Sequence, residues 1–305
     1  TRRYLGCLYY LIVLKLIFNG NTVRIDGDSS PILTDSGGKL MIKLIATDMD
    51  GTLLNSNGEL NEEIYSIVGR LKGMGIKFAA ASGRQLMSLK RKFEPVDEDI
   101  IYIAENGAYA LDRDEELYIN AIDKDSVAEI IETSKEVNGS AIFICGKKYS
   151  YTDNEELFET MKKPIFGYEI KYVSDLRTVN EDILKIGLFD TIDPRESSMK
   201  IMLPKFEGKV HMTLSGYNSL DFLNNEVNKG TALKCVMDKF GIEKDETIVF
   251  GDNYNDIEMF DAAGTSFAML NADEYVRSRA KYTIGKNDDN AVIETIKSII
   301  KEIDR

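Results

Sequence analysis

With 305 residues, the chain is longer than a single hydrophobic core usually supports, so two domains are the first expectation. Its composition is ordinary for a soluble globular protein, with 43% hydrophobic residues, 29% charged residues and five prolines, which argues against disordered, collagen-like and multi-span membrane proteins. The 51 acidic and 38 basic residues leave a net charge of −13, so we expect no binding to nucleic acid through its phosphate backbone.

The cysteine pattern bears on the cellular compartment. Cys7, Cys145 and Cys235 are too far apart in the sequence to suggest a disulfide framework or a zinc site. A reducing compartment suits such a chain, so we expect a cytoplasmic protein. We also expect a monomer or a weak homodimer.

The first forty residues differ from the rest of the chain. The stretch 4–18 is apolar except for Lys15, but it is shorter than the roughly 20 residues that a membrane-spanning helix needs. The polar residues that follow offer a poor signal-peptide cleavage site, and a buried-strand pattern opens at Met41. We therefore interpret residues 1–40 as a leader or an artefact of cloning outside the native fold, and we expect no stable membrane association. A membrane anchor, or an extra strand or helix packed on the domain, is the alternative.

Beyond this segment, strand and helix patterns alternate. The run 42–47 is largely apolar, with Lys43 near its start and Thr47 at its end, as expected for a strand that is covered on both faces. Apolar residues then recur at helical spacing over 60–71, and glycines end the pattern. A strand at 77–81, a helix at 87–93 and a strand at 100–104 follow. Two strand–helix units with short connections predict parallel strands joined by right-handed crossovers.

The middle of the chain has a different pattern and lacks a phosphate loop. The sequence predicts a helix at 126–137, strands at 141–145 and 183–189, and a hairpin of strands 210–214 and 220–224. This mixture predicts an α+β module, and its length of roughly 105 residues is enough for a separate small domain.

The C-terminal part returns to the first pattern, with a helix at 232–240, a strand at 247–250 and a last helix at 292–303. We therefore predict a Rossmann-like α/β core with a doubly wound parallel sheet, which the α+β module interrupts. Sites in such folds lie beyond the carboxyl ends of the strands. The predicted domains are a core of residues 41–122 and 229–305 and an inserted domain of residues 123–228.

Two carboxylates follow the first predicted strand. Asp48 and Asp50 are two positions apart, so an extended conformation would point both to one face, which is costly without a compensating cation or proton. Such a pair can hold Mg²⁺ and can offer one carboxylate as a nucleophile. An acidic turn at the end of a strand explains this motif equally well when it is taken alone.

Three further motifs occur at predicted strand ends or helix starts. Ser82 and Gly83 follow the second strand, where a hydroxyl and backbone amides at a helix start can bind an anion. Lys229 opens a helix and can neutralise phosphate. The run 251–256, Gly-Asp-Asn-Tyr-Asn-Asp, follows another strand, and helix capping explains one of its acids but not both. Taken singly, each motif also fits a helix cap or a solvated surface.

Together and in this order, the motifs closely resemble those of the haloacid dehalogenase (HAD) superfamily, and within it those of the Cof-type phosphatases with a class IIB cap. The resemblance covers residues 41–305, includes Glu-Asn-Gly-Ala at 105–108, and shows no departure at a catalytic position. It implies an HAD core with an inserted α+β cap.

The resemblance also implies how the acidic residues act. Asp48 would attack the phosphorus atom and form an aspartyl-phosphate, while Asp50 would protonate the leaving alcohol and then activate water. The Asp48 carboxylate, the Asp50 carbonyl and Asp252 would hold Mg²⁺. Asn255 or Asp256 would lie just outside this ligand set or near the substrate.

The remaining motif residues would bind the substrate. The resemblance implies that Ser82, the Gly83 amide and Lys229 grip the phosphoryl oxygens, with Thr52 and Asn255 as further contacts. An anionic nucleophile approaches a dianionic phosphate only where positive charge offsets the repulsion, which suits Mg²⁺ and Lys229. The cap would close over the site and contact the rest of the substrate.

We therefore expect a Mg²⁺-dependent phosphatase that hydrolyses small phosphorylated metabolites, such as sugar phosphates or related phosphomonoesters. A hexose phosphomutase on the same fold is the nearest alternative, and its requirement for a bisphosphate activator would identify it. A non-catalytic phosphate-binding protein is a further alternative, although the intact set of Asp48, Asp50, Lys229 and Asp252 argues against it.

Overall fold

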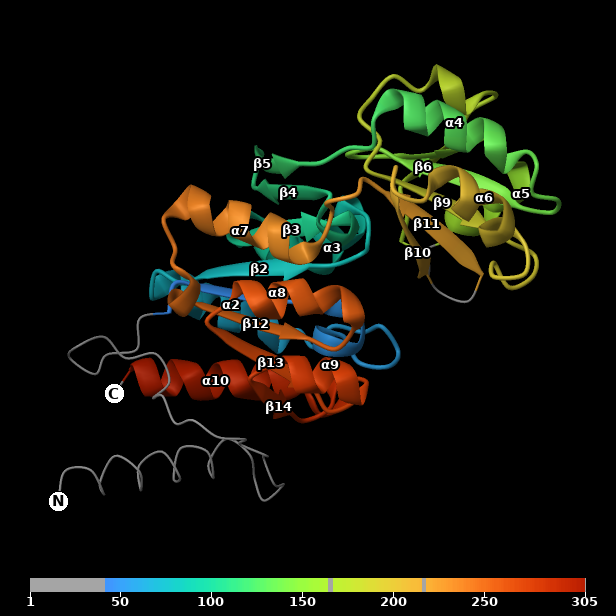
Figure 1. The fold of residues 1–305 in the computed structure, drawn as a ribbon. Coiled ribbons are helices and arrows are strands. Elements are labelled where there is room, and N and C mark those ends of the chain that lie inside the picture. The colour runs from blue at the N-terminus through green and yellow to red at the C-terminus, as the bar shows by residue number, and fades with distance from the viewer. Residues whose placement is uncertain (1–41, 164–166, 216–217, 305) are drawn as a thin grey trace. The chain divides into compact units, whose positions relative to one another are not determined.

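The computed structural model describes residues 42–163, 167–215 and 218–304, so the predicted leader, residues 1–40, lies outside the described residues (Figure 1). The described residues form two compact units. The first unit takes in residues 42–82, 95–101 and 233–304, and the second takes in residues 83–94 and 102–232. No helix of the described part is both long and apolar enough to cross a membrane.

A parallel sheet forms the centre of the first unit, with the strand order β14-β13-β12-β1-β2-β3. In β1 all four side chains are buried, because the apolar run is covered on both faces. The pairs β12–β1, β1–β2, β12–β13 and β13–β14 are parallel. These strands span Leu44–Thr47 (β1), Lys77–Ala81 (β2), Ile100–Ala104 (β3), Thr247–Gly251 (β12), Thr265–Met269 (β13) and Tyr282–Ile284 (β14).

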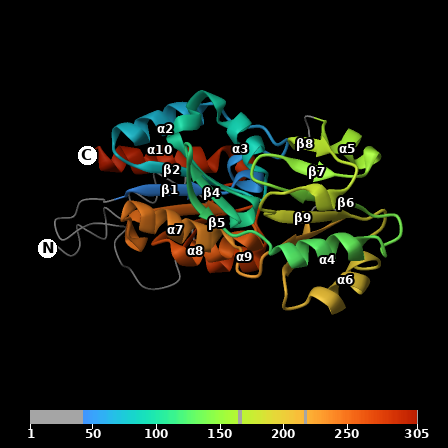
Figure 2. The same ribbon diagram turned by 90° about the horizontal axis from the view of Figure 1, so that it is seen from above.

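Helices cover both faces of this sheet. Figure 2 shows α2 and α10 on one face and α8 and α9 on the other. The buried side of α10 carries Val292, Ile296 and Ile300 at helical spacing, and α10 packs against α2. The helices span Glu63–Gly73 (α2), Ile257–Ala262 (α8), Glu274–Arg279 (α9) and Ala291–Ile303 (α10), while Lys229–Phe240 (α7) begins in the second unit and continues in the first.

The second unit contains the end of β3, a hairpin and a separate six-stranded sheet. The hairpin strands continue the order β3-β4-β5, and the six-stranded sheet has the order β10-β11-β9-β6-β7-β8. Its pairs are antiparallel except β7–β8. The strands span Tyr109–Asp112 (β4), Glu115–Ile119 (β5), Ala141–Cys145 (β6), Ser150–Thr152 (β7), Ile170–Tyr172 (β8), Lys185–Phe189 (β9), His211–Ser215 (β10) and Ser219–Leu223 (β11).

The core of the second unit lies between its six-stranded sheet and its helices. Ile130 and Phe206 from two helices pack with Leu188 and Phe222 from the sheet. The first of these helices begins after Asp123, whose carboxylate accepts a 2.9 Å hydrogen bond from the Ser126 amide. The helices span Leu86–Lys92 (α3), Lys124–Ser134 (α4), Glu155–Met161 (α5) and Ser198–Phe206 (α6). Short turns span Met49–Leu53, Glu94–Asp99, Glu105–Gly107, Leu176–Thr178, Lys244–Glu246, Tyr254–Asp256 and Asn287–Asp289.

The predicted fold class, an α/β core with an additional α+β part, is confirmed. One helix start is wrong, because α2 begins at Glu63 and Leu60 instead forms a β-bridge with Leu54. The second unit contains the whole of the predicted insert, 123–228, together with flanking residues of the predicted core. The predicted domain boundaries therefore stay a prediction.

Candidate active site

The carboxyl ends of β1 and β12 place two aspartates side by side in the first unit. The two strands are parallel neighbours, with Thr47 opposite Phe250, and the Asp48 amide donates a 2.9 Å hydrogen bond to the Phe250 carbonyl. Asp48 directly follows β1, and Asp252 directly follows β12. Parallel pairing thus brings residues from distant parts of the chain to one edge of the sheet.

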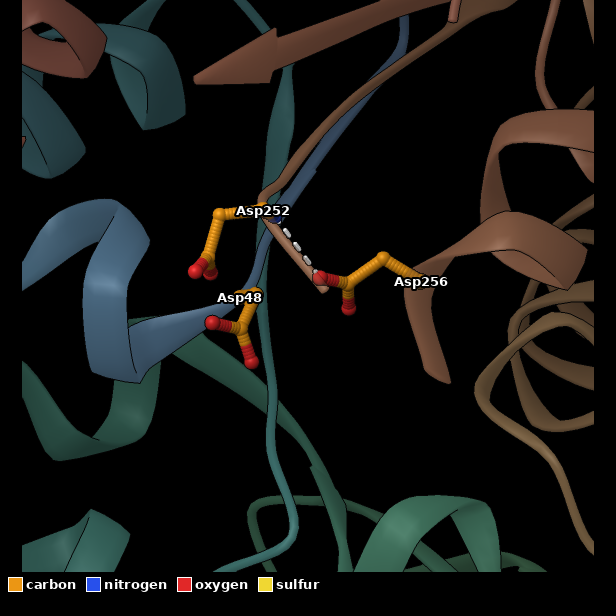
Figure 3. A group of neighbouring side chains, drawn as sticks. All are labelled: Asp48, Asp252 and Asp256. Carbon is orange, nitrogen blue, oxygen red and sulfur yellow. Dashed lines mark hydrogen bonds between the residues drawn. The ribbon is translucent and has the colours of Figure 1, made fainter. Parts of the chain in front are cut away.

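Asp256 completes a group of three carboxylates. Asp48, Asp252 and Asp256 each offer an oxygen within 4.8 Å of the others, and they come from the ends of two strands and the start of α8 (Figure 3). Asp48 is 6% exposed and Asp256 is fully buried. Like charges this close repel one another where water cannot screen them, and a divalent cation offsets that repulsion. The three acids provide the hard oxygen ligands that Mg²⁺ prefers, so the residues fit a magnesium site.

Hydrogen bonds hold two of these carboxylates in place. Oδ2 of Asp256 accepts from the backbone amides of Asp252 and Asn253, at 2.9 and 3.0 Å (Figure 3 draws the bond to Asp252). Oδ1 of Asp252 accepts from the Thr52 hydroxyl at 2.7 Å. A Cβ at Gly251 would lie 2.5 Å from the Cβ of Asp256, so this approach requires glycine. These contacts therefore fix the positions of the Asp252 and Asp256 carboxylates.

The loop Met49–Leu53 carries Asp50 past this group. Asp50 is exposed, whereas the Thr52 side chain is buried. Gly51 has a φ of +80°, and a Cβ there would lie 2.3 Å from Oδ2 of Asp252, so only glycine lets the loop pass this close. Nδ2 of the Asn271 side chain donates a 2.8 Å hydrogen bond to the Gly51 carbonyl. Sequence analysis did not identify Asn271, because an asparagine in a loop gives no signal of such a contact.

The predicted phosphate-binding residues are divided between the units. Ser82 is 2% exposed and follows β2 in the first unit, whereas Gly83 and Lys229 belong to the second. Lys229 is fully buried at the start of α7. Asn255 is exposed in the turn after β12. The contacts of all four residues with a phosphoryl group stay predictions.

The structure thus brings together Asp48, Thr52 and Asp252 from the predicted site and adds Asp256 to the group. Sequence analysis left open whether Asn255 or Asp256 lies nearer the metal, and the buried carboxylate of Asp256 is the one beside Asp48 and Asp252. The predicted contribution of the Asp50 carbonyl stays a prediction.

Comparisons with known proteins place this geometry in context. Residues 45–296 match the family model described as haloacid dehalogenase-like hydrolase. The chain is 32% identical over 269 residues to the Escherichia coli (strain K12) protein named 5-amino-6-(5-phospho-D-ribitylamino)uracil phosphatase YbjI, which covers 86% of this chain and 97% of the relative.

Two solved structures show the same fold. A crystal structure from Eubacterium rectale has a TM-score of 0.78 at 30% identity, with 85% of this chain and 99% of the other covered. The HAD subclass IIB sugar phosphatase BT4131 has a TM-score of 0.71 at 22% identity, with 84% and 98% covered. At that identity the second likeness concerns the fold alone.

Proposed function

We propose that the chain, which belongs to the haloacid dehalogenase-like hydrolases, is a Mg²⁺-dependent phosphatase that acts on small phosphorylated metabolites. The match of residues 45–296 to the family model confirms the predicted family. Together with the Escherichia coli relative it also confirms the predicted class of enzyme, a phosphoric monoester hydrolase. The observation that carries the proposal is a group of three buried or half-buried carboxylates. Asp48 and Asp252 follow adjacent parallel strands, and Asp256 lies at the start of α8.

The proposed metal ligands are the carboxylates of Asp48 and Asp252 and the carbonyl of Asp50, with Asp256 beside them. When bound, Mg²⁺ would supply the positive charge that lets a carboxylate approach a phosphate dianion. The hydrogen bonds from Thr52 to Asp252 and from two backbone amides to Asp256 fix these groups before substrate binds. Little reorganisation is then needed at the moment of reaction.

Asp48 is the proposed nucleophile. An oxygen of its carboxylate forms a bond to phosphorus as the bond from phosphorus to the ester oxygen breaks. Asp50 donates its proton to the leaving ester oxygen. Asp50 then takes a proton from water, which attacks the aspartyl-phosphate, releases inorganic phosphate and restores the Asp48 carboxylate. The exposed position of Asp50, against the 6% exposure of Asp48, suits a group that transfers protons to and from substrate and solvent.

Phosphate esters of sugars or related polyols are the proposed substrate class. The Escherichia coli relative is named for an ester of this kind, a phosphorylated ribityl chain attached to a uracil ring. We propose that Ser82, the Gly83 amide and Lys229 bind the phosphoryl oxygens, with Thr52 and Asn255 as further contacts. The part of the chain that contains the six-stranded sheet would then contact the remainder of the ester.

The test is phosphate release from a panel of sugar phosphates, nucleotides and cofactor phosphates, with and without Mg²⁺. Asp48→Asn keeps the shape of the side chain but removes the nucleophilic charge, so turnover should fall by several orders of magnitude. Asp193→Asn, at an exposed position of the second unit, is the matched control and should keep full activity. Wild-type turnover in Asp48→Asn would overturn the proposal.

A further inference from the structure

A fully buried ion pair lies in the second unit, apart from the three carboxylates. Nζ of Lys185 is 2.5 Å from Oε2 of Glu105, and the two side chains are only 3% and 1% exposed. Lys185 opens β9, and Glu105 opens the turn that follows β3. The pair therefore links the six-stranded sheet to a part of the chain 80 residues earlier.

The surroundings of this pair contain more acids than bases. The buried carboxylate of Asp221 also acts on both charges, and the Tyr168 ring centroid lies 6.0 Å from Nζ of Lys185. Burial alone would lower the pKa of Lys185, but Glu105 and the other groups raise it well above its usual value. Lys185 therefore keeps its charge, while burial raises the pKa of its partner Glu105 above the usual range for a carboxyl group.

Stability does not explain why such a pair is buried. Removing two charges from water costs about as much as their attraction returns, and apolar side chains of similar volume often serve a fold equally well. A buried pair of this kind therefore calls for a specific contact that an apolar pair cannot make.

That contact is with Gly83. Nζ of Lys185 also donates a 3.1 Å hydrogen bond to the Gly83 carbonyl. The Glu105 amide donates to the carbonyl of Arg84, at 3.0 Å, so each member of the ion pair holds one of two consecutive peptide groups. A Cβ at Gly83 would lie 2.8 Å from Oδ1 of Asn106, so a larger residue would displace that side chain. Because glycine rotates freely, outside contacts must set its backbone conformation.

We propose that Lys185 is a positioning residue: by holding the Gly83 carbonyl it fixes the backbone conformation of Gly83 and thereby the direction of the Gly83 amide toward the phosphoryl group, while Glu105 holds the Lys185 side chain in place. The inference rests on the proposed function, in which the Gly83 amide binds phosphate. Lys185 itself does not touch substrate; it acts through the Gly83 backbone.

The test compares Lys185→Met with the double variant Lys185→Met/Glu105→Met. The single variant leaves a buried carboxylate without its cation, so it should lose much of its thermal stability. The double variant removes both charges and should recover melting behaviour close to wild type, but it has no donor for the Gly83 carbonyl. Misplacing a group that positions substrate can cost about 10²-fold in rate, so kcat/KM of the double variant should fall by about 10- to 100-fold.

Two further measurements separate positioning from a structural role. The loss in the double variant should be equal across the panel of esters, because every ester presents the same phosphoryl group. Binding of inorganic phosphate in the presence of Mg²⁺, followed by calorimetry, should weaken about tenfold or more, in line with a lost anion contact. The exposed pair Lys200–Glu196 provides the control, since Lys200→Met/Glu196→Met should change neither measurement.

The inference is overturned if the stable double variant has wild-type kcat/KM and phosphate affinity. Losses that differ strongly between esters would also overturn it, because they would show direct contact with the leaving group. A wild-type protein that hydrolyses no ester would remove the proposed function alone, and the phosphate titration would then decide the role of Lys185.

Discussion

The Thr52 hydroxyl donates a 2.7 Å hydrogen bond to Oδ1 of Asp252 across 200 positions of sequence. The bond joins the loop that carries Asp50, the proposed proton-transfer residue, to the strand end that carries a proposed metal ligand. Thr52 was expected to contact the phosphoryl group, and that contact stays a prediction. Its observed partner is the carboxylate, which the bond orients.

Replacing Thr52 with valine should therefore weaken metal binding more than it weakens the fold. The variant keeps the side-chain shape and removes the donor to Asp252, and the loss of such a supporting hydrogen bond typically costs about 10–100-fold in metal affinity. The measurement is the Mg²⁺ concentration for half-maximal activity. Thr295→Val is the matched control, because the buried Thr295 hydroxyl donates an equally short bond to Ala291 inside α10, and it should leave this concentration unchanged.

Replacing Gly51 with alanine should disrupt the site through steric contact with Asp252. A Cβ at Gly51 would lie 2.3 Å from Oδ2 of Asp252, and the left-handed backbone adds a cost of about 1–2 kcal/mol. Gly58→Ala isolates the backbone cost, because Gly58 has a φ of +75° and nothing lies within 4 Å of the position that an added Cβ would take. Both variants should melt earlier, and only Gly51→Ala should lose Mg²⁺ binding. Equal Mg²⁺ affinity in the two would contradict the close approach.

Substitution of Asp256 should affect metal binding, whereas substitution of Asn255 should affect substrate binding. Asp256→Asn preserves an oxygen that accepts from the two backbone amides but removes a charge beside Asp48. The Mg²⁺ concentration for half-maximal activity should therefore rise by about tenfold or more. Asn255→Ala changes an exposed side chain and should raise KM for substrate while leaving the Mg²⁺ requirement alone. Titrations of activity against each ligand measure both effects, and the reverse pattern would assign the metal contact to Asn255.

Asp50 distinguishes hydrolysis from a mutase reaction. Asp50→Asn removes two proton transfers, each typically worth roughly 10²–10⁴ in rate. A phenyl phosphate with a good leaving group needs little acid assistance, so this variant should accumulate phosphoenzyme on Asp48, visible as an added phosphate in the intact mass. Wild-type protein should release phosphate without a sugar bisphosphate. Conversion of a hexose 1-phosphate to its 6-phosphate with almost no phosphate release would favour the mutase.

The strands that the sequence predicted most closely are those in which an apolar run fills all or nearly all of the strand. The predicted strands at 77–81 and 100–104 have the observed bounds, because a buried parallel strand needs an unbroken apolar run. Strand β13 was missed because buried Thr265 and Ser266 interrupt its apolar pattern. The β4–β5 hairpin was also missed, since its turn places Arg113 at a φ of +55° where glycine or asparagine would have given a signal.

In the candidate site, too, the sequence predicts some residues and misses others. The sequence places Asp48 and Asp252 at the carboxyl ends of predicted parallel strands, where sites in such folds lie, and the structure shows that these two strands are neighbours. The position of Asp256 depends on the turn Tyr254–Asp256, whose backbone directs the carboxylate back to two amides. Asn271 reaches Gly51 from another loop. Local sequence patterns do not encode such contacts between loops.

The three carboxylates all belong to the first unit, so metal binding and the folding of that unit are thermodynamically linked. An unfolded chain holds no such group, and a ligand at 100 times its Kd stabilises the folded state by about 2.7 kcal/mol. Added Mg²⁺ should therefore slow hydrogen exchange of the backbone amides in β1 and β12, the strands that Asp48 and Asp252 directly follow. The amides of β6 and β9 in the second unit should exchange at the same rates with and without metal.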